Sequence, residues 1–155
     1  SMTTAECYAL IGADYTEVLR RMGNEDRVRR FLLKFAEEPS YGLLCRSVEA
    51  GDAKEAFRAA HSIKGVCLNL GLTALYRSAG DLCEELRGGA FTDAVPGLLR
   101  RVGEDYQKTN DALVELMDTL AESCTEAEYQ RLEEIFVNCS RYELGFWEMA
   151  WTLER

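Results

Sequence analysis

Apolar residues recur with a helical period along almost the whole chain, and proline or glycine separates the periodic stretches. No stretch shows the alternation of a half-buried strand. We therefore expect helices, in chain order, over residues 3–10, 15–22, 25–37, 40–50, 53–70, 72–87 and 93–121. The pattern predicts an all-α fold, an antiparallel four-helix bundle with added N-terminal helices and a long C-terminal helix.

Apolar stripes and end signals support this division. The expected core positions of the helices over 25–37 and 72–87 are Val28, Phe31, Leu32, Phe35, Leu75, Ala79, Leu82 and Leu86. Asp52 is a candidate N-cap for the helix over 53–70, which ends at Gly71. Pro96 falls in the first turn of a helix that starts at Asp93, where proline is tolerated.

Residues 125–155 are expected to form a helical extension that follows a bundle domain of residues 1–122. Thr125 to Glu128 match a capping box, which predicts a helix start. Glu143 falls in the middle of an apolar stripe made of Leu132, Ile135, Phe136, Cys139, Phe146, Trp147 and Ala150. A free helix would expose this stripe, so we expect it to pack on the bundle or to join two copies of the chain as a homo-oligomer.

The single histidine, His61, lies in the run AHSIKG at residues 60–65. On a helical wheel at about 100° per residue, the core face lies between about 140° and 260° from this histidine. That face comprises Ala56, Ala59, Ala60, Ile63, Val66, Cys67 and Leu70. His61 is therefore expected to point to solvent, on a face that also carries Lys54, Phe57, Arg58, Lys64, Gly65 and Leu68.

This combination of residues suits phosphoryl chemistry. A neutral imidazole is a nucleophile near neutral pH, because its ordinary pKa is about 6.5, and it can take up a phosphoryl group and release it. Lys64, three residues on, is placed to stabilise the added negative charge. Gly65 costs roughly 0.5–1 kcal/mol of helix stability but removes a side chain that would crowd a phosphoryl group. The alternative is that Lys64 is an ordinary solvated lysine. Gly65 would then be a tolerated destabilising residue or a point of close contact between helices.

In residues 60–65 and their surroundings the chain resembles the histidine phosphotransfer (HPt) domains of multistep phosphorelays. The resemblance spans roughly residues 10–120 and also rests on RMGNE at 21–25, FLLKF at 31–35, Gly51-Asp52 and Gly71-Leu72. It implies that His61 is the phosphoacceptor, that Lys64 assists the phosphoryl group and that Gly65 clears space. After Gly65, Val66, Cys67 and Leu68 stand where the family usually has small residues. Val66 and Cys67 face the expected core, so only Leu68 is expected to alter the docking surface.

The resemblance also implies partners and a mechanism. A receiver domain of a response regulator and a hybrid sensor kinase would exchange the phosphoryl group with His61. The receiver would supply its own acidic pocket and Mg²⁺, so the chain would need no cofactor or metal. It would be a phosphocarrier without independent turnover. Phe57 and Leu68 are candidates for partner binding or for the core, while Lys54 and Arg58 form a solvated face that attracts an acidic partner. The main alternative is a helical module that docks a partner without phosphorylation.

A second resemblance concerns residues 135–151, which look like the closing helix of the thiaminase II (TenA-like) family. In that family the glutamate that matches Glu143 takes part in thiamine-related hydrolysis. The match covers only the C-terminal fifth of the chain, without a matching nucleophile or substrate pocket elsewhere. A thiaminase-like hydrolase is therefore the least favoured interpretation.

Composition narrows the function classes further. At 155 residues, 47% of them hydrophobic, the chain can bury a substantial core without disulfides or metals. A net charge of −9 argues against nucleic-acid binding. The sequence has no apolar run long enough for a membrane span and begins without signal-peptide features. Six scattered cysteines without a CxxC pair fit reduced thiols, so we expect a cytoplasmic protein.

Overall fold

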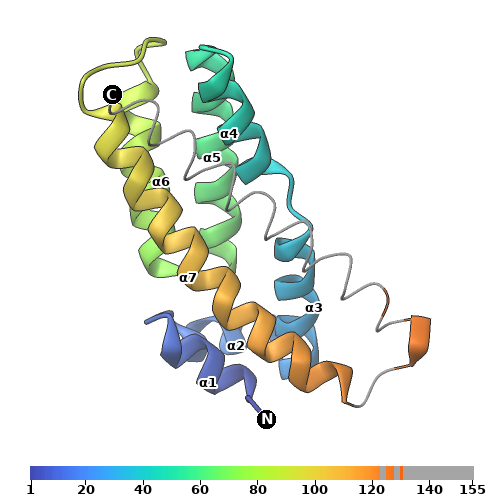
Figure 1. The fold of residues 1–155 in the computed structure, drawn as a ribbon. Coiled ribbons are helices and arrows are strands. Elements are labelled where there is room, and N and C mark those ends of the chain that lie inside the picture. The colour runs from blue at the N-terminus through green and yellow to red at the C-terminus, as the bar shows by residue number, and fades with distance from the viewer. Residues whose placement is uncertain (123–124, 128–129, 131–155) are drawn as a thin grey trace.

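The computed structural model describes residues 1–122, 125–127 and 130, and Figure 1 shows how they are arranged. This part of the chain contains α1 (Thr4–Leu10), α2 (Tyr15–Met22), α3 (Glu25–Ala36), α4 (Ser40–Glu49), α5 (Ala53–Leu70), α6 (Thr73–Leu86) and α7 (Val95–Ala121). The all-α prediction is confirmed, and the described residues include no strand. None of the described helices is both long and apolar enough to cross a membrane.

The helices α5, α6 and α7 form three positions of a four-helix bundle, in which α6 runs antiparallel to both α5 and α7 (Figure 1). The fourth position is shared by α3 and α4, which follow each other in the same direction along α5 (Figure 1). Pro39 separates these two helices, because proline lacks an N–H donor and disfavours helical geometry in the residue before it. Thus α3 belongs to the bundle, and the added N-terminal helices are α1 and α2.

Tyr106 of α7 joins the two halves of the divided position. Its ring stacks on Tyr41 of α4 with centroids 3.7 Å apart, and it meets Phe35 of α3 at 6.0 Å in a tilted arrangement. All three rings are buried. Buried aromatic pairs of this kind contribute about 0.5–1.5 kcal/mol beyond the area that they bury. This cluster therefore holds α3 and α4 against α7 although the helix is interrupted at Pro39.

Most predicted core positions are buried, but Phe31 is not. Val28, Leu32 and Phe35 are at most 3% exposed, whereas Phe31 is 44% exposed. On the wheel Phe31 lies at one edge of the stripe, about 60° from Val28, where the helix surface turns toward solvent. The prediction that Phe31 belongs to the core is therefore wrong.

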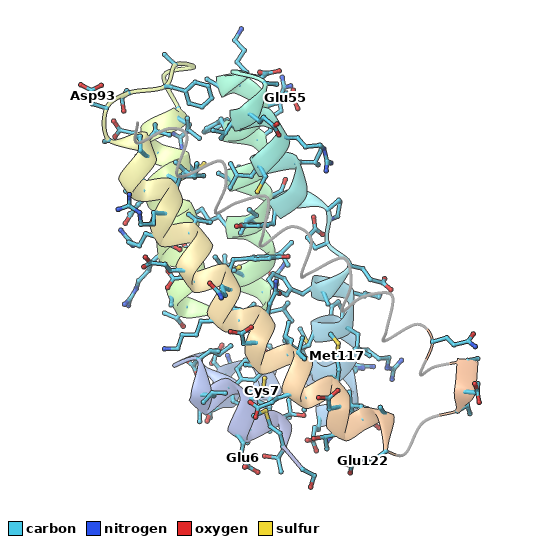
Figure 2. The ribbon with its side chains drawn as sticks, in the orientation of Figure 1. Glu6, Cys7, Glu55, Asp93, Met117 and Glu122 are labelled. Atoms are coloured by element: carbon cyan, nitrogen blue, oxygen red, sulfur yellow. The ribbon has the colours of Figure 1, made fainter. Side chains whose placement is uncertain are left out.

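The helices α1 and α2 pack across the end of the bundle where α5 turns into α6 (Figure 1). Cys7 of α1 lies against α7, and its thiol donates to the carbonyl oxygen of Ala112 at 3.6 Å (Figure 2). The Asp14 N–H donates to the carbonyl oxygen of Gly71 at 3.0 Å. The predicted C-terminal helix, with Glu143 and its apolar stripe, lies outside the described residues, as does the predicted contact between two copies.

Candidate functional site

The helix that carries His61 begins and ends as predicted. At its start, the Asp52 carboxylate accepts a hydrogen bond from the Glu55 N–H at 3.1 Å, which satisfies one of the free donors of the first turn. At its end, Gly71 adopts a left-handed conformation with φ of +65°. The Leu72 N–H then donates to the Cys67 oxygen at 3.0 Å, which is the Schellman pattern.

The N-terminal helices satisfy the remaining carbonyl groups at this end of α5. Arg21 donates to the carbonyl oxygens of Leu68 and Asn69 at 3.1 and 3.0 Å, and the Tyr8 hydroxyl donates to that of Leu70 at 2.7 Å. A guanidinium beside a helix C-terminus also interacts favourably with the helix dipole. The helix that carries His61 is thereby fixed at both ends, which holds its middle turn in place.

His61 lies in the middle of α5 with its side chain exposed, while the opposite face of the helix is buried. The predicted core residues Ala56, Ala59, Ala60, Ile63, Cys67 and Leu70 are at most 4% exposed. Val66, which was expected in the core, is only half-buried at the edge of that face. The Phe57 ring lies one turn before the imidazole, with centroids 6.1 Å apart and planes 22° from parallel. The imidazole is therefore open to a partner on one side and supported on the other.

Lys64 lies beside the histidine, half-buried, with its side chain directed toward α6. Its ammonium nitrogen is 5.8 Å from the centroid of the Tyr76 ring. Its Cδ and Cε atoms are 3.7 and 3.8 Å from the place that a Cβ atom would take at Gly80. This lysine is therefore more than a freely solvated side chain, because two residues of α6 shape its position.

Gly65 is exposed on the same face of α5. A Cβ atom built there would have no described atom outside α5 within 4 Å. A close helix–helix contact within the described residues therefore does not explain this glycine. What the glycine provides is an open surface one turn from the imidazole.

The four predicted partner-binding residues differ in their surroundings. Leu68 is 54% exposed, and Lys54 is exposed at the start of the helix. Arg58 is exposed but forms an ion pair with Glu55. Phe57 is half-buried, and the guanidinium carbon of Arg87 lies 5.4 Å from its ring centroid. These residues form a mixed apolar and cationic surface around His61.

Sequence reasoning missed the contributions of α6, namely Tyr76, Gly80 and Arg87. The available signal was the turn at Gly71: in an antiparallel pair, residues at equal distances on either side of the turn lie opposite one another. That register places the neighbourhood of Tyr76 and Gly80 opposite residues 62–66. The side-chain contacts themselves depend on the rotation of α6 about its own axis. This rotation cannot be predicted from the sequence pattern.

A second cationic surface, also unpredicted, lies between α2 and α3. It is a groove lined by Arg21, Met22, Arg27, Arg30, Phe31 and Lys34. The ammonium nitrogen of Lys34 is 5.2 Å from the ring centroid of Phe31, the exposed aromatic residue of α3. Arg21 connects this groove to α5 through its hydrogen bonds to the backbone of Leu68 and Asn69. Arg21 therefore links this groove to the end of the His61 surface at which Leu68 lies.

The four described cysteine thiols are poor candidates for nucleophiles. Cys67, on the inner face of α5, is buried, and burial raises the pKa of its thiol. Burial also raises the pKa of Cys7 to about 11 and that of Cys45 to about 12. The thiolate is the reactive form, so these groups stay inert near neutral pH. Within the described residues, no cluster of three or more histidine, cysteine or carboxylate side chains suits a metal ion.

The comparisons with known proteins agree with this geometry. A family model described as the Hpt domain matches residues 32–128, more than half of the chain, and confirms the resemblance on which the HPt prediction rests. No curated protein and no solved structure matches the chain. The matched residues include α4, α5, α6 and α7, and hence the helix of His61 with its neighbours in the bundle. The chain therefore belongs to the family of Hpt domains, the histidine phosphotransfer modules that carry phosphoryl groups in phosphorelays.

Proposed function

We propose that this chain is a phosphorelay intermediate in which His61 accepts a phosphoryl group from a receiver aspartate and passes it to another. Hpt domains work with receiver domains and kinases in two-component relays, as phosphocarriers rather than catalysts. The observation that carries the proposal is the exposed imidazole of His61 in the middle of a helix that is capped at both ends. A rigid, exposed nucleophile suits transfer between two visiting proteins.

The transfer itself is a displacement at phosphorus. The unprotonated ring nitrogen of His61 attacks the phosphorus of the aspartyl phosphate, and a nitrogen–phosphorus bond forms. The phosphorus–oxygen bond to the aspartate breaks, and its electron pair leaves with the carboxylate. The other ring nitrogen keeps its hydrogen. In the second transfer a receiver carboxylate attacks the same phosphorus, and neutral imidazole leaves.

Lys64 and Gly65 have complementary roles in this proposal. The Lys64 ammonium stabilises the charge of the phosphoryl group, which carries about −1.5 to −2 at neutral pH. The open surface at Gly65 admits the phosphoryl group and the receiver loop that delivers it, because no described atom outside α5 lies within 4 Å of the place that a Cβ atom would take.

For the partner surface, we propose Phe57 and Leu68 as apolar contacts and Lys54 and Arg58 as charged ones. Arg58 stays available to an acidic partner, because its exposed ion pair with Glu55 is worth at most about 1 kcal/mol and readily exchanges. The cationic groove between α2 and α3, joined to this surface through Arg21, extends it. A receiver domain or hybrid sensor kinase with an acidic rim fits such a surface, since opposite charges speed encounter and set orientation.

We propose that the protein is cytoplasmic. Four described cysteines are free thiols, which supports a reducing compartment such as the cytoplasm.

We also propose residues 1–122 as the phosphotransfer domain, because α1, α2 and the turn between them form hydrogen bonds to the end of α5. Residues 125–155 would then form a separate extension.

The deciding experiment incubates the full chain with a phosphorylated receiver domain and maps any phosphate by mass spectrometry. We expect an acid-labile, base-stable phosphate on His61. His61→Gln should abolish phosphoryl uptake and leave receiver binding within about twofold, because the amide keeps a polar side chain of similar size but lacks the nucleophile. Ser62→Ala, the exposed neighbour, serves as the matched control and should take up phosphate normally. Binding by the wild-type chain without phosphoryl uptake would instead identify an interaction module.

A further inference from the structure

Among the residues that the structure describes, the ammonium group of Lys64 lies over an aromatic ring and forms no ion pair with a carboxylate. Its nitrogen lies 5.8 Å from the Tyr76 ring centroid. None of the ion pairs found among residues 1–122 involves Lys64. The negative face of an aromatic ring attracts a cation without carrying a net charge. The ring therefore restrains the position of Lys64 without pairing its charge with a carboxylate.

The restraint begins along the stem of the side chain. The Lys64 Cδ and Cε atoms run past Gly80, within 4 Å of where a Cβ atom would be. A methyl group there would only touch the stem, but a longer side chain would occupy its path. Tyr76 lies one helical turn before Gly80 on α6. It is half-buried, which restricts the motion of its ring. The two residues together form a groove for the lysine.

This arrangement suits a cation that must respond to a phosphoryl group. An aspartate or glutamate in the position of Tyr76 would form a charge pair that competes with phosphate for the ammonium. A phosphoryl group on His61 offers several charged acceptor oxygens, and its attraction for an ammonium exceeds that of a neutral ring. The lysine can therefore leave the ring when the phosphoryl group arrives.

We propose that Tyr76 is a positioning residue that holds the Lys64 ammonium on the α6 side of His61, ready for the phosphoryl group, with Gly80 leaving the space for its stem. The inference rests on the proposed function, because it assumes that His61 becomes phosphorylated. Tyr76 acts through Lys64 and does not itself bind the phosphoryl group.

The kinetic test compares Tyr76→Leu with Tyr76→Phe in the full chain, using a phosphorylated receiver domain as donor. Tyr76→Leu should slow phosphoryl uptake by about two- to fivefold, because the cation–ring attraction is lost. Tyr76→Phe keeps the ring and should match the wild type. In a Lys64→Ala background, Tyr76→Leu should have no further effect, as two members of one interaction are not additive. Gly80→Leu, which blocks the stem, should slow uptake in the same way.

A second measurement follows Lys64 directly by nuclear magnetic resonance in the unphosphorylated protein. The Tyr76 ring should shift the side-chain proton resonances of Lys64 in the wild type and in Tyr76→Phe, but not in Tyr76→Leu. Phosphorylation of the wild type should reduce this shift as the lysine moves to the phosphoryl group. Wild-type uptake by Tyr76→Leu, or an equal slowing in the Lys64→Ala background, would overturn the role of Tyr76. Absence of uptake by the wild type would instead refute the proposed function, and the inference with it.

Discussion

Asn110, in the middle of α7, has an unusual environment for an amide side chain. It is 2% exposed, and neither its Nδ2 nor its Oδ1 atom has a hydrogen-bond partner among the described residues. Leaving a buried polar group unpaired costs about 1–3 kcal/mol. The neighbouring Thr109 is also buried, but its hydroxyl donates to the Asp105 carbonyl oxygen at 2.8 Å. The two side chains therefore provide a matched pair, one unpaired and one paired.

We predict that Asn110→Leu raises the free energy of unfolding by about 1 kcal/mol, because the substitution removes two unpaired polar atoms from the core. Thr109→Val is the control and should give no increase, since it removes a hydrogen bond that the wild type makes. Urea unfolding monitored by circular dichroism measures both. A loss of stability in Asn110→Leu would mean that the amide is paired in solution or that the site does not accept the larger side chain.

At the scale of elements, the turn between α5 and α6 is the place where the N-terminal helices meet the bundle. A Cβ atom at Gly71 would lie 2.4 Å from the Val18 Cγ2 atom and 2.9 Å from the Asp14 carbonyl oxygen. The same glycine ends α5 with φ of +65°, a conformation that other residues adopt at a cost. Gly71 thus has two roles: it ends α5, and it lets α2 pack closely against the turn.

Gly71→Ala should lower the free energy of unfolding by about 2–4 kcal/mol, because it combines backbone strain with a steric clash. Gly12→Ala is the matched control: its φ is +62°, but apart from its chain neighbours no described atom lies within 4 Å of the place that a Cβ atom would take. That variant should lose only about 1 kcal/mol. Chemical unfolding of both variants gives the comparison, and equal losses would show that the contact with α2 contributes little.

For the whole molecule, the buried thiols predict how stability depends on pH. Burial raises the pKa of Cys7 to about 11 and that of Cys45 to about 12, from an ordinary value of 9.0. The pKa values of Cys67 and Cys83 are raised by burial as well. A raised pKa means that the folded state favours the protonated thiol. The resulting stabilisation is complete below pH 9 and is lost progressively as the pH rises toward 11 or 12.

We therefore predict a free energy of unfolding that stays constant near pH 8 and decreases between pH 9 and pH 11. Each buried thiol contributes up to about 1.4 kcal/mol per pH unit in this range. Cys45→Ala should make the decrease less steep by the share of one thiol, even though it creates a small cavity. Urea unfolding at several pH values tests this. Equal slopes for the wild type and Cys45→Ala would contradict the assignment.

Local signals in the sequence determined the helices and the orientation of His61. Asp52 starts α5 and Gly71 ends it, each through hydrogen bonds to residues close in the sequence. The period of the apolar positions then determines which side of α5 faces the core. The motif of His61, Lys64 and Gly65 was equally visible, since it lies within two turns of one helix. The identity of the chemical groups at the site was therefore available without a structure.

The tertiary structure alone decided what surrounds those groups. The exposed position of Phe31, the joining of α3 and α4 into one bundle position, and the contacts of Lys64 with Tyr76 and Gly80 all involve separate helices. Such contacts depend on the rotation and spacing of packed helices, which vary continuously with the side chains at the interface. A helical period specifies one face of one helix, whereas the partner of that face is decided by packing.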